Sequence, residues 1–161
     1  MISETDLKHL RRCIDLAEEA VDSGDQPFGS VLISAEGDRV FEGRNEVAGG
    51  DHTRHPEFAI ARWAAENMEP TERAKATVYT SGEHCPMCAA AHGWVGLGRI
   101  VYATSSRQLV AWLDKRGVSR SPVHELPIEQ VLRNAVVEGP VAELADEVFA
   151  LHQRCLDRSP A

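Results

Sequence analysis

The chain has 161 residues and a formal net charge of −8, with 43% hydrophobic and 26% charged residues. This length suits one domain, over residues 1–161, that buries a core without disulfides. The sequence contains neither the ~20 consecutive apolar residues of a membrane span nor a secretory signal in its first residues. We therefore expect a cytoplasmic protein that has no membrane partner.

The first third of the chain predicts a helix followed by a hairpin. Residues 5–22 carry apolar side chains at helical spacing, which give one hydrophobic face: Leu7, Leu10, Ile14, Ala17 and Val21. A turn at residues 23–25 leads to a strand from Phe28. Residues 35–38 are typical of a hairpin turn, so the strands around Val31 and Val40 should pair antiparallel. The polar loop at residues 49–54 could be a pocket wall or an ordinary surface loop.

Helices and strands alternate through the rest of the chain. Pro56 and Pro86 are each preorganised to begin a helix, and the first helix should bury a stripe made of Phe58, Ala61, Ala65 and Met68. Further strands are expected at residues 76–82, 99–103 and 118–126, and further helices at residues 105–115, 128–135 and 141–155. This order predicts an α/β fold with three layers, α/β/α, around a central mixed sheet of about five strands.

The most informative motif joins His55-Pro56-Glu57 to Cys85-Pro86-Met87-Cys88. Imidazole and thiolate are zinc ligands, and a structural zinc site normally has four protein ligands where this pattern offers three, His55, Cys85 and Cys88. The fourth corner is then left for water, so the pattern indicates one catalytic zinc ion per chain. His55 and Cys85 should each stand at a helix N-cap, where the helix dipole favours thiolate over thiol.

These residues resemble the signature of the cytidine deaminase-like zinc deaminase superfamily, His-x-Glu with Pro-Cys-x-x-Cys. Residues 27–33 and Gly43-Arg44-Asn45 are similar to two strands of its guanine deaminase and tRNA adenosine deaminase branch, and residues 137–156 are similar to its closing helix. The resemblance covers residues 7–155 and implies the cytidine deaminase-like fold. The chain departs from the branch at His84, where proline is usual, and after Thr104, where it follows no substrate-specific pattern.

The resemblance also implies a hydrolytic deamination. Zinc makes water acidic enough to supply hydroxide near neutral pH. Glu57 takes the water proton, passes it to a ring nitrogen and later protonates the departing amine, which leaves a carbonyl base and ammonia. The residues alone leave purely structural roles open. Glu57 could serve merely to complement the helix dipole, and His55 could serve merely to cap the helix.

Four further residues are candidates for substrate binding: Asn45, Phe28, Trp94 and Asp114. The resemblance assigns Asn45 a hydrogen bond to the base, although the residue could also serve a strand-end turn. Phe28 and Trp94 could each line the pocket or fill the core. Asp114 is the nearest candidate for the second proton-transferring carboxylate of the guanine deaminase branch. His92 is expected to be a pocket or core residue rather than a fourth zinc ligand.

Net charge bears on the substrate. An enzyme that acts on tRNA must attract a polyanion, whereas this chain has 17 Lys and Arg against 25 Asp and Glu. The expected partner is therefore a free nucleobase rather than a nucleic acid, with guanine first and cytosine or an aminotriazine next. Deamination of adenosine in tRNA is the alternative. The resemblance further implies a homodimer formed through the zinc-site helices.

Two other functions explain part of the motif. A non-catalytic zinc-binding scaffold would keep His55, Cys85 and Cys88, but it has no need of Glu57. Redox work by the two cysteines would explain neither His55 nor Glu57. The complete motif therefore favours hydrolysis.

Overall fold

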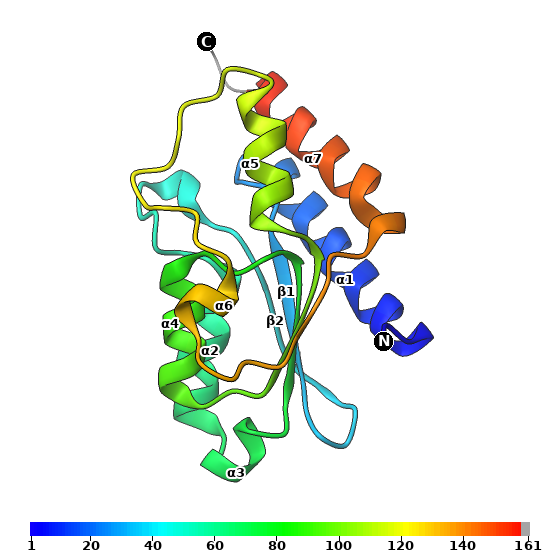
Figure 1. The fold of residues 1–161 in the computed structure, drawn as a ribbon, viewed down its shortest axis with the longest axis vertical. Coiled ribbons are helices and arrows are strands. Elements are labelled where there is room, and N and C mark those ends of the chain that lie inside the picture. The colour runs from blue at the N-terminus through cyan, green and yellow to red at the C-terminus, as the bar shows by residue number, and fades with distance from the viewer. Residues whose placement is uncertain (159–161) are drawn as a thin grey trace.

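A computed structural model describes residues 1–158. Its centre is a five-stranded mixed sheet in the order β2-β1-β3-β4-β5 (Figure 1). The strands are β1 (Gly29–Ile33), β2 (Arg39–Arg44), β3 (Thr77–Gly82), β4 (Arg99–Thr104) and β5 (Val137–Glu138). β1 runs antiparallel to both β2 and β3, whereas β4 runs parallel to β3 and to β5. The predicted hairpin and mixed sheet are confirmed.

Helices cover both faces of this sheet (Figure 1). The long helices α1 (Glu4–Asp22) and α7 (Ala145–Arg158) lie on one face, and α2 (Pro56–Asn67), α4 (Pro86–Val95) and α6 (Ile128–Val131) lie on the other. The remaining elements are η1 (Val47–Gly49), α3 (Pro70–Arg73), α5 (Ser106–Asp114) and η2 (Ala142–Leu144). The three-layer α/β/α fold is thus confirmed. Among residues 1–158, no helix is long and apolar enough to cross a membrane.

The strands show how the layers are specified. Val31 and Tyr79 join the core under α1 and α7, whereas Leu32 and Val78, one position away in each strand, join the core under α2. Successive strand residues point to opposite faces, so a strand that is covered on both sides is apolar at most of its positions. All five residues of β1 are buried.

Three expectations for the second half of the chain were wrong in detail. Residues 118–126 form no strand. Val123 there is 49% exposed, and Pro122 cannot donate to a ladder. The fifth strand is instead β5, where Val137 pairs with Ile100. The helix expected at residues 128–135 ends after one turn, because Leu132 turns to extended backbone and packs against the core beneath α4. The last helix begins as η2 and continues as α7.

The buried stripe of α2 also differs from the expected one. Ala61 is buried as predicted, but Ala65 is exposed and Phe58 is only half-buried. The buried apolar face is instead Ile60, Ala61 and Ala64, in line with Glu57. The helix is rotated so that a carboxylate lies against the sheet, which an apolar periodicity cannot foresee.

Asp6 ties the start of α1 to the sheet. This side chain is 4% exposed and accepts hydrogen bonds from Ser3, Tyr79 and Arg99, the last two at 2.7 Å. Burial raises the pKa of Asp6, but the hydrogen bonds from Arg99, Ser3 and Tyr79 outweigh that effect and hold the pKa below its ordinary value.

We expect Asp6→Asn to lower the free energy of unfolding by about 2–4 kcal/mol at neutral pH, since it removes a paired charge that is buried against the sheet. A depressed pKa stabilises the fold above the unfolded-state pKa of about 3.9, and this contribution is lost as the pH falls from that value through the lower folded-state pKa. Urea titrations of both proteins at neutral and acid pH should therefore show the difference shrinking in acid. Asp15→Asn, at an exposed position of the same helix, should change little. A difference that is constant with pH would contradict the account.

Candidate active site

The two helix starts bring the predicted zinc ligands together. His55 is the N-cap of α2 and Cys85 is the N-cap of α4, each followed by proline at the first helical position. The His55 Nδ1 atom lies 3.6 Å from Cys85 Sγ and 3.6 Å from Cys88 Sγ. All three ligand atoms lie within 4.8 Å of one another.

This spacing fits a tetrahedral zinc ion. Zinc–sulfur and zinc–nitrogen bonds of about 2.3 and 2.0 Å at a tetrahedral angle place N and S about 3.5 Å apart, close to the observed distances. Hydrogen bonds from Cys88 and His55 lower the pKa of Cys85 to about 4. The same Cys85 contact and burial raise the pKa of Cys88. Without a cation the pair thus keeps one proton, and a bound divalent ion favours the release of that proton.

Glu57 lies in the first turn of α2 and is 6% exposed. Its Oε1 atom accepts a hydrogen bond from Thr80 Oγ1 at 2.6 Å and one from Ser30 Oγ at 3.0 Å. Neither hydroxyl is bonded to Oε2. Burial raises the pKa of Glu57, and the Thr80 hydrogen bond opposes that rise. Burial therefore favours the neutral form of a carboxyl group that the two hydroxyls hold in place.

Strand register places the two hydroxyls under Glu57. Ser30 of β1 is paired directly with Thr80 of β3, and the two oxygens are 2.9 Å apart. Both side chains are fully buried. Sequence reasoning missed these residues. For Ser30 the signal was a hydroxyl inside an otherwise apolar strand, since a buried hydroxyl requires a partner.

Asn45 is 1% exposed at the end of the hairpin. Its Oδ1 atom accepts hydrogen bonds from the backbone N–H groups of Gln26 and Val47, so the turn role left open by the sequence is present. Its Nδ2 atom is buried and has no partner among residues 1–158. An unpaired buried donor is costly, so this amide is ready to bind an acceptor.

The other three residues predicted to bind substrate lie outside the zinc-ligand cluster. Phe28 is half-buried, and its ring packs edge-on against His152 of α7 with the ring centroids 5.3 Å apart. Trp94 is 91% exposed on α4, so it does not fill the core of the chain. Asp114 is exposed at the end of α5, where it pairs with Arg120 at 2.7 Å. The role of each in substrate binding stays a prediction.

Two buried histidines stand beside the zinc ligands. His92 contacts the backbone oxygen of Gly98 through Nε2 at 2.9 Å and is not part of the ligand cluster. His84, where the branch usually has proline, is 1% exposed and meets the His92 ring edge-on at 5.4 Å. Burial lowers the pKa of both imidazoles, which keeps them neutral and avoids adding positive charge next to a cation site.

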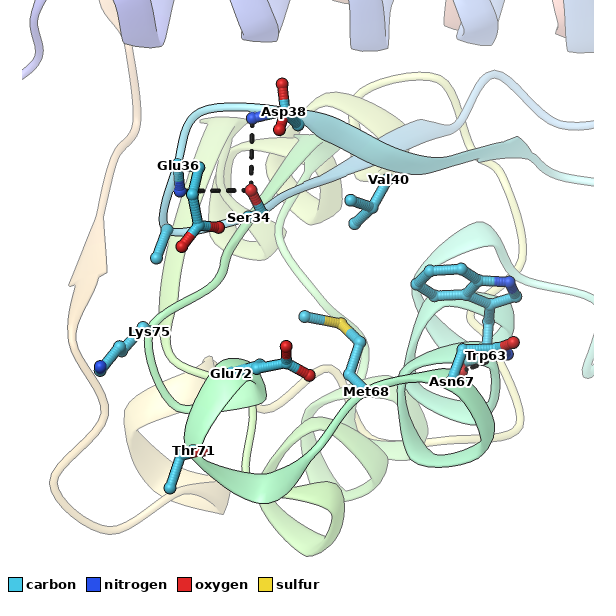
Figure 2. A pocket seen from close by; sticks show the side chains of 11 residues that line it. Ser34, Glu36, Asp38, Val40, Trp63, Asn67, Met68, Thr71, Glu72 and Lys75 are labelled. Carbon is cyan, nitrogen blue, oxygen red and sulfur yellow. Dashed lines mark hydrogen bonds between the residues drawn. The ribbon is translucent and has the colours of Figure 1, made fainter.

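A surface hollow lies away from the zinc ligands. Figure 2 shows an open hollow of about 340 Å³ between the β1–β2 turn, the last turn of α2 and α3. Trp63, Asn67 and the C-cap Met68 come from the second half of α2, about 9–17 Å along the helix axis from Glu57. The hollow contains none of the zinc ligands. The chemistry is therefore at the opposite end of α2.

Comparison with known proteins places this geometry in a family context. Residues 3–104 match the family described as the cytidine and deoxycytidylate deaminase zinc-binding region. The chain is 33% identical over 116 residues to a probable cytosine deaminase of Schizosaccharomyces pombe, covering 72% of this chain and 70% of that protein. It is 35% identical over 96 residues to the guanine deaminase of Bacillus subtilis (58% and 61%). It is 33% identical over 104 residues to the tRNA-specific adenosine deaminase of Haemophilus influenzae (64% and 60%).

Solved structures agree on the fold. A crystal structure of a mutant protein in complex with 8-azaguanine superimposes with a TM-score of 0.76 at 20% identity, covering 98% of this chain and 87% of the other. At that identity the likeness concerns the fold alone. Together with the ligand cluster, the family match confirms the predicted family and zinc as the cofactor.

Proposed function

Because the chain belongs to the cytidine and deoxycytidylate deaminase zinc-binding family, whose matched relatives include deaminases of cytosine and guanine, we propose that it is a zinc-dependent hydrolase that deaminates a free nucleobase. Guanine is the first candidate substrate, and cytosine or an aminotriazine is the next. The proposal depends on one observation: Glu57, two residues after a predicted zinc ligand, has a buried carboxylate that hydrogen bonds from Ser30 and Thr80 fix in place. Thiolate ligation also suits a reducing compartment, so we propose a cytoplasmic location.

His55, Cys85 and Cys88 would hold the metal, which would supply the acidity that water needs to act as a nucleophile near neutral pH. Glu57 then accepts a proton, gives it to a ring nitrogen and later gives one to the departing amine. Thr80 and Ser30 orient Oε1, which leaves Oε2 for proton transfer. A scaffold without chemistry has no use for a buried carboxylate held in this way.

The free Nδ2 of Asn45 supports recognition of an aminated ring that carries a hydrogen-bond acceptor. Guanine and cytosine each present a carbonyl oxygen and ring nitrogens as acceptors. A substrate that binds Asn45 satisfies a buried donor that otherwise lacks a partner. Analogues without an acceptor at that place should bind poorly.

Deamination of adenosine in tRNA is the second candidate, since two matched relatives are described as tRNA deaminases of that kind. The arrangement of charges argues against it. Arg12 pairs with Glu42 at 2.8 Å, and Arg11 pairs with Glu147 at 3.2 Å. These arginines already face carboxylates on a chain of net charge −8, which leaves less positive potential for a polyanion.

We also propose a homodimer formed through the zinc-site helices. Trp94, 91% exposed, stands on α4 only six residues after Cys88. Large exposed aromatic side chains are characteristic of interface centres. A second copy that covers Trp94 also brings α4 of one chain near the other chain's site.

The proposal is tested by incubating the zinc-loaded protein with guanine, cytosine, adenine, ammeline, cytidine and an adenosine-bearing tRNA anticodon loop. The expected result is ammonia release from a free base, with guanine as the first candidate. For the RNA, inosine formation is measured instead. Activity on the RNA alone would replace this proposal with the tRNA reaction. If the zinc-loaded protein has no activity on any of these substrates, the result would favour a non-catalytic zinc-binding scaffold.

A further inference from the structure

Glu83 binds two distant points of the chain with one carboxylate. Its Oε2 atom accepts the backbone N–H of Ser106 at 2.8 Å, and its Oε1 atom accepts the backbone N–H of Ile128 at 2.8 Å. Its own N–H donates to the carbonyl of Thr104 at 2.8 Å. Ser106 begins α5 and Ile128 begins α6, so the carboxylate satisfies N–H groups that have no partner inside those helices.

The chain between those two points, residues 106–127, is here called the flap. It leaves the sheet as α5 and returns as an irregular loop to α6 (Figure 1). No residue of the flap is buried, whereas Thr104 before it and Ile128 after it are 2% and 0% exposed. A segment without buried side chains opens at a low free-energy cost.

A second attachment lies along α5. The Trp112 ring stacks on Phe149 of α7 with the centroids 5.7 Å apart. The guanidinium of Arg116 lies 3.7 Å above the Trp112 ring and donates to Gln153 of α7 at 2.9 Å. The flap is therefore held at its base by Glu83 and on its length by a half-exposed aromatic stack.

Glu83 is also two residues before the zinc ligand Cys85. We propose that Glu83 is a positioning residue, which latches the base of the flap to the loop that carries Cys85 and so holds that zinc-ligand loop in place. The proposal rests on the proposed function only in taking Cys85 as a zinc ligand. Loss of the latch frees the flap and releases the loop that carries Cys85.

The test compares the zinc-loaded full chain with Glu83→Gln, Glu83→Asp and the matched control Glu129→Gln, an exposed glutamate beside Ile128. Glutamine turns an amide N–H₂ group toward one of the two backbone donors, so one hydrogen bond is lost. Trypsin should cut Glu83→Gln at Lys115, Arg116 or Arg120 about tenfold faster than the parent. Glu83→Asp keeps both acceptors and should recover part of the protection, and Glu129→Gln should match the parent.

A second readout uses cobalt(II) in place of zinc. The thiolate-to-cobalt absorption band should weaken or shift in Glu83→Gln and stay unchanged in Glu129→Gln. Equal flap cleavage in Glu83→Gln and the parent would overturn the proposal, and so would cleavage raised equally at Lys75 outside the flap.

If Glu83→Gln does not fold, amide hydrogen exchange in the parent decides. The latch is supported if the amides within the flap exchange fast while those of Ser106 and Ile128 at its two ends are protected. It is overturned if the flap amides are as protected as those of β3. No readout needs a substrate, so this result and the deamination result stand independently.

Discussion

Replacing Glu57 with glutamine should lower kcat for the preferred nucleobase by about 10³-fold or more while zinc remains bound. The amide has nearly the same shape and can still accept hydrogen bonds from Thr80 and Ser30. It cannot take a proton from water and return it. The fold should remain intact, because burial already disfavours the charged form of Glu57. Ammonia release and zinc content, measured on the same preparation, check the result.

Glu66→Gln is the matched control for this variant. Glu66 lies on the same helix but is exposed, so its replacement should leave both rate and zinc content unchanged. A Glu57→Gln protein that keeps more than about a tenth of the parent's kcat would remove Glu57 from the proton-transfer role, since such a role is worth at least about a hundredfold.

Replacing Cys88 with serine should remove both the metal and the activity. The hydroxyl is a far poorer zinc ligand than a thiolate, and Cys88 is buried one turn inside α4 where no other ligand can take its place. Bound zinc stabilises the folded chain, by about 4 kcal/mol when free zinc is a thousandfold above its dissociation constant. The variant should therefore have a lower Tm in zinc-containing buffer.

A chelator shows whether the lower Tm of Cys88→Ser comes from loss of the metal or from damage to the core. A chelator should lower the Tm of the parent protein toward that of Cys88→Ser and should leave the Tm of the variant unchanged. Cys155→Ser is the control, since that half-buried cysteine lies on α7 and outside the ligand cluster. If Cys88→Ser retains one zinc ion per chain, the ligand set proposed for this protein is wrong.

The sequence by itself determined the features that depend on neighbours along the chain. The zinc ligands stand at fixed offsets from Pro56 and Pro86, and proline followed by helix formers defines where each helix begins. Burial on both faces made β1 apolar apart from Ser30, and the hairpin turn set its pairing with β2. These signals are local, so the family, the layers and the metal could be read directly.

Only the tertiary structure decided which distant residues meet. The hydroxyls of Ser30 and Thr80 reach Glu57 because β1 and β3 pair in one register, and a slip of one residue would turn both to the other face. Glu83 binds Ser106 and Ile128 because β4 lies parallel to β3 and ends at the same edge of the sheet. The fifth strand was misplaced for the same reason. Val137 becomes a strand residue only beside Ile100, since a strand is stable only when a neighbour satisfies its backbone.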